Sequence, residues 1–302
     1  MHQRLQRLLW SFVVLGALGQ SQAASFYTVK RGDTLWSISQ KSKISVEQIK
    51  KLNRLKSDTI YSGQKLKLAN VQTVVKRNPP LPFAVALSTK KVLKVPVYAV
   101  HVNLAHKGVK VRPLLPSIGL GRGGAKLGYL AQRPNLIAAI NGGYFHPQSY
   151  MPAGDLVVQG RQLAYGRIQT ALSVTPDNKA RIHHNTGSWK GYETVIATGP
   201  HVVQNGRLVV QPRVEGYRDP AVWGRAKRSA VGLVNNEYLI FMTSPQELSL
   251  AEVGKIMQKM KAREVILLDG GSSAGLVWDR KLIVPPARAL SFGIGVFVGQ
   301  KG

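Results

Sequence analysis

The 302-residue chain has no cysteine and few acidic residues. The absence of cysteine excludes disulfide scaffolds, thiol nucleophiles, Cys-ligated zinc and lipoprotein anchoring through an N-terminal Cys. Only 14 Asp and Glu stand against 42 Lys and Arg, which gives a formal net charge of +28. Such an excess favours a polyanionic partner, namely nucleic acid, acidic lipid or a phosphate-bearing cell-wall polymer. Hydrophobic residues at 44% and charged residues at 19% exclude wholesale disorder and a polytopic membrane protein.

Long apolar runs are also lacking, except near the N-terminus. Residues 8–18 are apolar, follow Arg4 and Arg7, and precede the small residues around Ala23. Because the run is about half of the roughly 20 apolar residues that span a bilayer, it predicts a signal peptide over residues 1–23 rather than an anchor. We therefore expect a mature protein without a transmembrane anchor, secreted to the periplasm, the cell wall or the extracellular space. In those compartments a basic protein encounters phosphate-bearing wall polymers before nucleic acid, so no specific nucleic-acid partner is expected.

The residues after the signal begin a small module. The segment from Tyr27 to Val29 predicts a short strand, and Asp33 is a suitable N-cap for a helix. Leu35 and Ile38 lie three positions apart, which places both on one face of that helix. These local signals predict a strand followed by a helix.

A second helix and strand follow. Ser45 and Gln48 form a capping box that opens the helix, with Ile49 and Leu52 on its inner face. Gly63 then permits a tight turn into a strand over residues 65–68. The predicted order is strand, helix, helix, strand.

The module at residues 25–69 resembles the LysM domain. The pattern Y-x-V-x-x-G-D-T-L-x-x-I stands at residues 27–38, L-N at 52–53 and G-Q-x-L at 63–66. The resemblance implies binding to N-acetylglucosamine-containing glycans such as peptidoglycan or chitin. It gives as candidate glycan-binding residues Gly32, Asp33, Thr34, Ser57, Asp58 and Ile60. Structural roles explain most of these residues equally well, so we expect ligand contacts mainly from backbone and loop side chains.

Charge and proline content organise the rest of the chain. Ten basic residues against three acidic ones over residues 26–68 favour an anionic wall, although a solvated charged surface explains them as well. Residues 70–82 contain Pro79, Pro80 and Pro82, which predicts a semi-rigid linker. Residues 83–300 then form one large domain.

The large domain reads as α+β with a mixed sheet. Alternating apolar residues over 98–104 predict a half-buried strand, and Asn205-Gly206 predicts a hairpin turn. A capping box at Ser249 opens a helix whose methionines have the spacing of core residues. The apolar run over 265–268 lacks alternation and predicts a buried central strand.

Four segments of this domain suit sugar and phosphate chemistry: NGGYF (141–145), TGP (198–200), RSAVG (228–232) and LDGGSS (268–273). In the last, Asp269 ends a buried strand, and the small residues after it bring backbone amides close to a bound group. Taken alone, that segment also fits an ordinary glycine turn. The four together, over residues 85–298, resemble the phosphodiester glycosidase family, which includes the mannose-6-phosphate uncovering enzyme. Ser272 departs from a common third glycine, and Ser229 from a common threonine.

The resemblance implies hydrolysis of an N-acetylglucosamine-1-phosphodiester, here in an envelope polymer or exopolysaccharide. Because a phosphate monoester leaves readily, acid catalysis matters less than in ordinary glycosidases and a phosphate-binding cation matters more. Asp269 is the candidate base or nucleophile, Asp155 the second carboxylate and Arg228 the phosphate clamp, unless Arg228 forms a structural salt bridge. His146 is a candidate acid or phosphate donor, although a lone loop histidine is more often a surface residue. Candidate substrate-binding residues are Asn141, Gly142, Gly143, Thr198, Gly270, Gly271, Ser272 and Ser273.

Other functions stay open at this point. The large domain could bind anionic polysaccharide without turnover, or bind nucleic acid through its charge. No cofactor is expected, and whether a divalent metal assists stays open. His183 and His184 are not expected to bind a metal together, because adjacent residues of a strand point to opposite faces. A G-x-G-x-x-G pattern begins at Gly119, but the next acidic residue is Asp155, which argues against dinucleotide binding.

Overall fold

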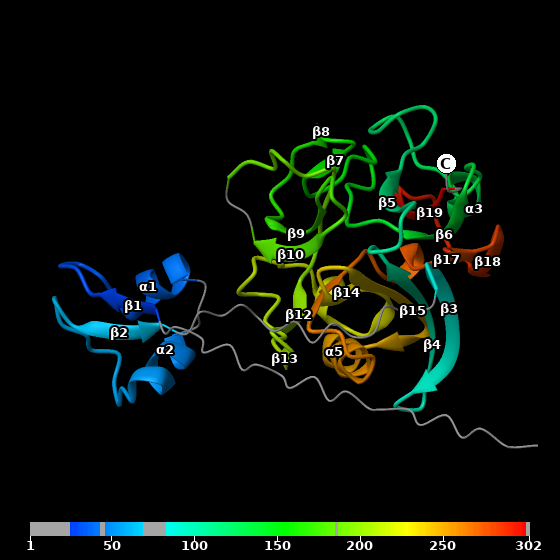
Figure 1. The fold of residues 1–302 in the computed structure, drawn as a ribbon. Coiled ribbons are helices and arrows are strands. Elements are labelled where there is room, and N and C mark those ends of the chain that lie inside the picture. Colours follow the sequence, from blue (N-terminus) through cyan, green and yellow to red (C-terminus); the bar gives the residue numbers. More distant parts are fainter. Residues whose placement is uncertain (1–24, 43–45, 69–82, 185–186, 300–302) are drawn as a thin grey trace, which may run out of the picture. The chain divides into compact units, whose positions relative to one another are not determined.

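The computed structural model describes residues 25–42, 46–68, 83–184 and 187–299 (Figure 1). The chain separates into two compact units, residues 1–77 and 78–302. The predicted signal (1–23) and the predicted linker (70–82) lie outside the described residues. No helix within the described ranges is long and apolar enough to cross a membrane.

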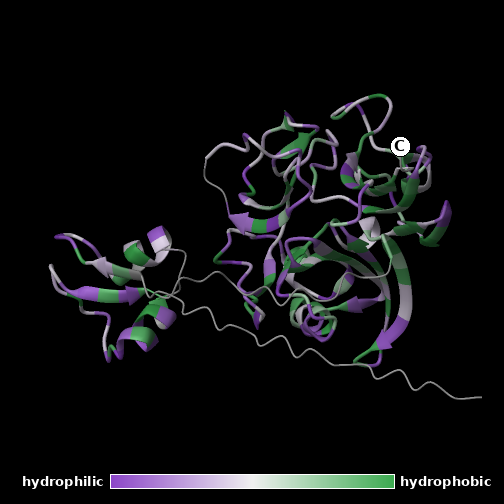
Figure 2. Cartoon of the chain, in the orientation of Figure 1, coloured by the Kyte–Doolittle hydropathy of each residue, from purple (hydrophilic) through white to green (hydrophobic). Residues whose placement is uncertain are grey.

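The first unit has the predicted order: β1 (Ser25–Thr28), α1 (Leu35–Ser42), α2 (Val46–Asn53) and β2 (Lys65–Leu68). The two strands pair antiparallel. Figure 2 shows alternating hydrophilic and hydrophobic residues along β2, and Leu66 and Leu68 face the core. Leu35, Ile38 and Ile49 complete that core, as expected.

Helix α1 begins one residue later than the sequence suggested. The Ser37 amide donates to Thr34 Oγ1 at 3.0 Å, and the Thr34 amide donates to Ser37 Oγ at 3.0 Å. Thr34 rather than Asp33 therefore caps the helix. The Asp33 carboxylate accepts instead from Tyr27 Oη (2.7 Å), the Lys30 amide (2.9 Å) and Lys41 Nζ (3.1 Å).

The inner face of α2 also differs from the prediction, because Leu52 is 37% exposed. Asn53 Nδ2 donates to the Lys67 carbonyl at 2.9 Å, and the Lys67 amide donates to Asn53 Oδ1 at 2.6 Å. Residues four apart share a helix face, so this contact turns Ile49 and Asn53 toward β2 and leaves Leu52 outside. Ser45, the predicted cap, lies outside the described residues.

The described residues of the second unit form three sheets. The seven-stranded sheet has the order β13 (Arg207–Leu208), β12 (His201–Gln204), β16 (Glu264–Leu267), β14 (Ala226–Asn235), β15 (Tyr238–Leu248), β4 (Val95–Asn103), β3 (Val85–Val92). One five-stranded sheet has the order β10 (Ala180–His184), β9 (Thr170–Val174), β11 (Thr194–Ala197), β7 (Leu156–Val158), β8 (Arg161–Ala164). The other has the order β18 (Lys281–Val284), β17 (Leu276–Trp278), β6 (Leu136–Asn141), β19 (Gly293–Val298), β5 (Val109–Leu114). The helices are α3 (Leu127–Leu130), α4 (Pro220–Trp223), α5 (Leu250–Lys259) and the 3-10 turn η1 (Gly271–Ser273).

The strand-rich domain with few helices is confirmed, but its sheets are not mixed. Every pair of neighbouring strands that the structure describes is antiparallel, and the parallel contact there is an isolated bridge between Gly154 and Ile168. Strand β16 is central and buried, as predicted. Val265 packs in the core that contains α5, and Ile266 packs in the core between the sheets. Burial on both faces explains the unbroken apolar run without parallel pairing.

Burial on both faces also corrects the prediction that the strand over residues 98–104, most of which lies in β4, is half-buried. Val100 and Val102 face the core between the sheets, while Val97 and Ala99 face the core that contains α5. The strand is therefore not half-buried, because its alternation sorts apolar residues between two cores rather than between core and solvent.

Two local predictions are confirmed in the second unit. Asn205 and Gly206 join β12 to β13 with φ values of 51° and 79°, as a tight hairpin turn requires. Ser249 and Glu252 form the predicted capping box of α5, and the buried Met257 belongs to the core.

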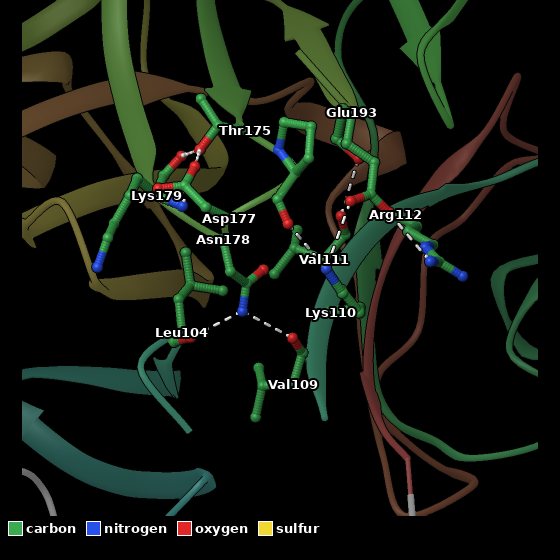
Figure 3. A network of polar contacts seen from close by, with 12 residues as sticks. Leu104, Val109, Lys110, Val111, Arg112, Thr175, Asp177, Asn178, Lys179 and Glu193 are labelled. Carbon is green, nitrogen blue, oxygen red and sulfur yellow. Dashed lines mark hydrogen bonds and ion pairs between the residues drawn. The ribbon is translucent and has the colours of Figure 1, made fainter. Parts of the chain in front are cut away.

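A polar network fastens β5 to the turn between β9 and β10 (Figure 3). Asn178 Nδ2 donates to the carbonyls of Leu104 (2.7 Å) and Val109 (2.8 Å). The Glu193 carboxylate accepts from Arg112 (3.0 Å) and Lys110 (3.4 Å). These contacts join two of the three sheets and so fix their strands relative to one another.

Candidate functional site

The predicted chemical segments meet where β16 and β6 end. Asp269 follows β16, and its amide donates to the Gly142 carbonyl at 3.0 Å. Thr198 follows β11, and its hydroxyl donates to the Leu267 carbonyl at 2.9 Å. Arg228 lies in β14, which pairs with β16. Strand ends from all three sheets therefore build one site.

Asn141 is the buried link between these strand ends. Its Nδ2 donates to the Asp269 carbonyl at 2.7 Å, and its Oδ1 accepts from the Gly275 amide at 3.1 Å. The side chain therefore holds the Asp269 loop and has little capacity left for a sugar.

The neighbouring glycines differ in what they offer a ligand. The Gly142 amide donates to the Phe292 carbonyl at 3.1 Å, whereas the Gly143 amide has no acceptor among the described residues. A Cβ at Gly142 would lie 2.5 Å from the Phe292 ring, and one at Gly143 would lie 3.0 Å from Thr198 Cβ. Close packing requires glycine at Gly142, and the buried Gly143 amide keeps a donor that no described residue uses.

The Asp269 carboxyl group lies in a desolvated environment, although the residue as a whole keeps some contact with solvent. Burial raises its pKa to about 6. The nearby Ser273 hydroxyl, the Gly270 amide (2.9 Å), Arg288 and Arg228 all oppose that shift. A carboxyl group with a pKa near neutrality at a strand end suits proton transfer.

Arg228 is only 1% exposed. Its Nε donates to the Leu248 carbonyl at 3.3 Å, and its Nη2 donates to the carbonyls of Ala221 (3.4 Å) and Gly224. Burial lowers its pKa, while Tyr144 and Asp269 raise it. These bonds tie β14 to α4 and to the end of β15, so most of the guanidinium is occupied.

Two tyrosines that the sequence analysis did not single out face the same region. The hydroxyls of Tyr144 and Tyr217 are buried without a hydrogen-bond partner among the described residues, and the ring centroids are 5.9 Å apart. Burial raises the pKa of both, and the Asp269 carboxylate raises that of Tyr144 further. Tyr144 belongs to the NGGYF motif, so its signal was present, whereas nothing in the sequence marks Tyr217.

Tyr144 and Tyr217 line a cavity of about 700 Å³. His146 is exposed and lines it too, as does His184. His183 instead packs against Trp189 at 5.5 Å between ring centroids, so the two histidines point to opposite faces as expected. Further lining residues with charged side chains are Arg167, Glu215, Arg218 and Asp219.

The structure does not bring Asp155 to this cavity. Its carboxylate accepts from Trp189 Nε1 at 2.6 Å and from the Gly166 amide at 2.8 Å. Both oxygens are therefore engaged by neighbouring parts of the fold.

The glycine-serine loop after Asp269 borders a smaller cavity of about 260 Å³. Gly271 and Ser272 line it, together with Lys227 and Glu247. Ser273 is buried, and a Cβ at Gly270 would lie 2.9 Å from the Lys227 carbonyl. The loop thus has Asp269 at one end and a small pocket with one basic and one acidic residue at the other.

Arg288 is a further cation at the site, and no motif in the sequence indicated it. Its guanidinium carbon lies 4.5 Å from the centroid of the Phe145 ring. The Ala287 amide donates to the Ser272 carbonyl at 2.7 Å, which fastens the Arg288 segment to the Asp269 loop. Within the described residues no group of three or more His, Asp and Glu side chains could hold a metal ion.

In the first unit the six predicted glycan-binding residues all have local structural contacts or conformations. Gly32 has a φ of 88°, Thr34 caps α1 and Asp33 is bonded as described above. Ser57 Oγ accepts from the Thr59 amide at 3.4 Å, Asp58 pairs with Lys50, and Ile60 packs against the core. Tyr61, which is 72% exposed beside them, is the residue of this loop with a free aromatic surface.

Comparisons with known proteins agree with both parts of the chain. Residues 27–69 match the LysM domain. A stretch of 74 residues is 38% identical to the cell wall-binding protein YocH of Bacillus subtilis strain 168. The matched stretch covers 23% of this chain and 26% of that protein. A 42-residue stretch is 69% identical to a probable N-acetylmuramidase of Lactococcus lactis subsp. lactis, covering 14% of this chain and 10% of that protein. The chain thus spans about a quarter or less of the curated relatives it matches.

Two solved structures share the fold of the larger unit. A hypothetical protein from Synechocystis has a TM-score of 0.59 at 19% identity, over 72% of this chain and 62% of that one. The zebrafish N-acetylglucosamine-1-phosphodiester alpha-N-acetylglucosaminidase catalytic domain, auto-inhibited by its pro-peptide, has a TM-score of 0.58 at 18% identity, over 72% and 82%. Residues 134–297, more than half of the chain, match the phosphodiester glycosidase family. The chain therefore belongs to the phosphodiester glycosidase family and carries a LysM domain ahead of the family domain.

Proposed function

We propose that this protein is a secreted, cell-wall-associated hydrolase that cleaves a sugar-1-phosphodiester of the N-acetylglucosamine-1-phosphate type in an envelope polymer or exopolysaccharide. The observation that carries the proposal is the Asp269 carboxyl group, whose pKa burial raises to about 6 at the meeting point of the family motifs. The family membership supports a hydrolase, and the LysM domain supports a substrate in the cell wall.

Asp269 acts as the base or the nucleophile in this proposal. As a base, its carboxylate takes a proton from water while the water oxygen bonds to the anomeric carbon. The bond from that carbon to the phosphate oxygen breaks, and the phosphate keeps the electron pair. Because the phosphate monoester is a stable anion, this step needs little protonation of the leaving group.

The surrounding groups have supporting roles. His146 lines the cavity and can donate a proton or a hydrogen bond to the phosphate. The Tyr144 hydroxyl and the Gly143 amide are donors with no acceptor in the part of the chain that the structure describes, so they suit oxygen atoms of the sugar or the phosphate. The engaged carboxylate of Asp155 favours a structural role for that residue.

In this proposal the first unit holds the enzyme on the cell wall. We propose that residues 25–69 bind peptidoglycan or another N-acetylglucosamine-containing glycan, and that residues 83–300 form the glycosidase domain. A net charge of +28 favours retention on an anionic, phosphate-bearing wall polymer. Both features raise the concentration of enzyme at a polymeric substrate.

The test is release of N-acetylglucosamine from UDP-N-acetylglucosamine or a simple N-acetylglucosamine-1-phosphodiester. We expect turnover by the unaltered chain and a loss of at least about 100-fold in Asp269→Asn, because a positioned base contributes at least that factor. Asp279→Asn, at an exposed turn, is the matched control and should keep full activity. A folded, glycan-binding chain without turnover on any sugar-1-phosphodiester would contradict the proposal and favour a polysaccharide-binding protein.

A further inference from the structure

We infer that Arg288, rather than Arg228, is the cation that binds the phosphate group, at an anion-binding site between Arg288 and the Asp269 loop. The inference rests on the proposed function only in taking that phosphate to belong to the substrate. Binding of an anion at Arg288 can be measured without any turnover.

The two arginines differ first in their free donors. Arg228 is 1% exposed, and its Nε and Nη2 already donate to main-chain carbonyls. Arg288 is half-buried, and its guanidinium makes no hydrogen bond or ion pair with any residue that the structure describes. All its N–H donors are therefore available to an incoming anion.

An aromatic ring holds the Arg288 side chain in place. The guanidinium carbon lies 4.5 Å from the Phe145 centroid, a distance typical of a cation–π contact. Phe145 stacks on Tyr150 with 5.4 Å between centroids and lines the 700 Å³ cavity. The guanidinium thus lies over a ring that lines the cavity, while its donors stay unpaired within the described residues.

The backbone of this segment is fastened to the loop that carries Asp269. The Ala287 amide donates to the Ser272 carbonyl at 2.7 Å, and Ala125 and Leu290 exchange main-chain hydrogen bonds of 2.9 Å. Pro286 packs on Gly275, where a Cβ would lie 2.3 Å from Pro286 Cγ. These contacts hold the backbone of the Arg288 segment against the Asp269 loop.

The charges at the site call for such a cation. An anionic phosphodiester that approaches an ionised Asp269 is repelled, and a guanidinium beside both groups offsets the repulsion. Both Arg288 and Arg228 lower the pKa of Asp269, so the positive charge of Arg288 acts on the carboxylate. A guanidinium also matches two phosphate oxygens at once.

The first experiment is calorimetric titration of the full chain with inorganic phosphate at low ionic strength, where ionic contacts are least screened. We expect Arg288→Met to weaken phosphate binding at least about 30-fold, because it removes the charge and the N–H donors that contact the anion. Arg288→Lys should retain part of the affinity, since the charge remains and the two-pronged contact is lost. Arg280→Met, at an exposed turn, should bind phosphate as the unaltered chain does.

A second arm uses turnover of the phosphodiester. Arg288→Met should lower kcat/KM at least about 30-fold and abolish competitive inhibition by phosphate, while Phe145→Leu should give a smaller loss of both. Phosphate binding by a folded Arg288→Met chain equal to that of the unaltered chain would overturn the inference, and so would a lack of binding by the unaltered chain. If phosphate binding depends on Arg288 but the unaltered chain shows no turnover, the proposed hydrolase function is wrong and the anion-binding site at Arg288 is still supported.

Discussion

Asn141 Nδ2 donates a 2.7 Å hydrogen bond to the main-chain carbonyl of Asp269, and so joins the ends of strands from two different sheets. The Asn141 Oδ1 accepts from the Gly275 amide, beyond the glycine-serine loop. The loop with the proposed catalytic carboxylate is therefore held from both sides by one fully buried side chain. The position of Asp269 depends on this clamp.

Removal of the clamp should cost stability as well as activity. Asn141→Ala leaves the Asp269 carbonyl and the Gly275 amide without a partner, so we expect the free energy of unfolding to fall by about 2–5 kcal/mol. Urea unfolding followed by circular dichroism measures it. Asn235→Ala is the control, because the Asn235 side chain accepts one 2.8 Å bond in a turn and should cost less than about 1 kcal/mol. Equal losses in the two variants would contradict the clamp.

Asp269 should destabilise the fold at neutral pH. Its pKa is about 6 in the folded protein and 3.8 ordinarily, so the fold favours the protonated carboxyl group. The stabilisation that comes from protonation is complete below pH 3.8 and is lost as the pH rises through 6. We expect Asp269→Asn to be more stable than the unaltered chain by about 1–3 kcal/mol at pH 7 and to lose that advantage near pH 4. Urea unfolding across this range measures the difference. A constant difference at all pH values, like that expected for Asp279→Asn, would show that the carboxyl group is not perturbed.

Close packing at Gly142 should make alanine costly there. A Cβ would meet the Phe292 ring at 2.5 Å and the Phe292 carbonyl at 2.7 Å, so we expect Gly142→Ala to lower the free energy of unfolding by about 1–3 kcal/mol. Gly128 is the matched control, because it lies in α3 with nothing within 4 Å of a Cβ. Gly128→Ala should be neutral or raise stability by up to about 1 kcal/mol. Thermal unfolding of both variants decides the comparison, and a harmless Gly142→Ala would refute the packing argument.

Asp33 should matter to the LysM domain through its hydrogen bonds. The Lys30 amide, the Tyr27 hydroxyl and Lys41 lower its pKa to about 2, so its contribution is present above pH 3.8 and is lost as the pH falls through 2. We expect Asp33→Asn to lower the unfolding temperature of the domain and its retention on peptidoglycan, because an amide cannot accept all three bonds.

Lys65→Gln is the control for that variant, since Lys65 is exposed on β2 and is not one of the candidate glycan-binding residues. Sedimentation of the full chain with peptidoglycan at pH 7 compares the two. Equal retention of both variants would show that the Asp33 contacts are dispensable.

Local rules predicted much of the fold. The capping box at Ser249, the turn at Asn205-Gly206 and the strand-helix-helix-strand order each depend on residues a few positions apart, so one sequence suffices to find them. The same rules misplaced the cap of α1 by one residue and the face of Leu52, because contacts with Ser37 and with Lys67 of β2 decide these.

The motifs by themselves determined the family and the segments that form the candidate site, because NGGYF, TGP, RSAVG and LDGGSS keep their residue types in order along the chain. Only the tertiary structure decided which side chains in that site are free. Arg228 bonds to the carbonyls of Leu248 and Gly224, while Arg288 lies open over Phe145. Hydrogen-bond capacity and solvent exposure are set by neighbours that are distant in sequence, and a motif carries no record of them.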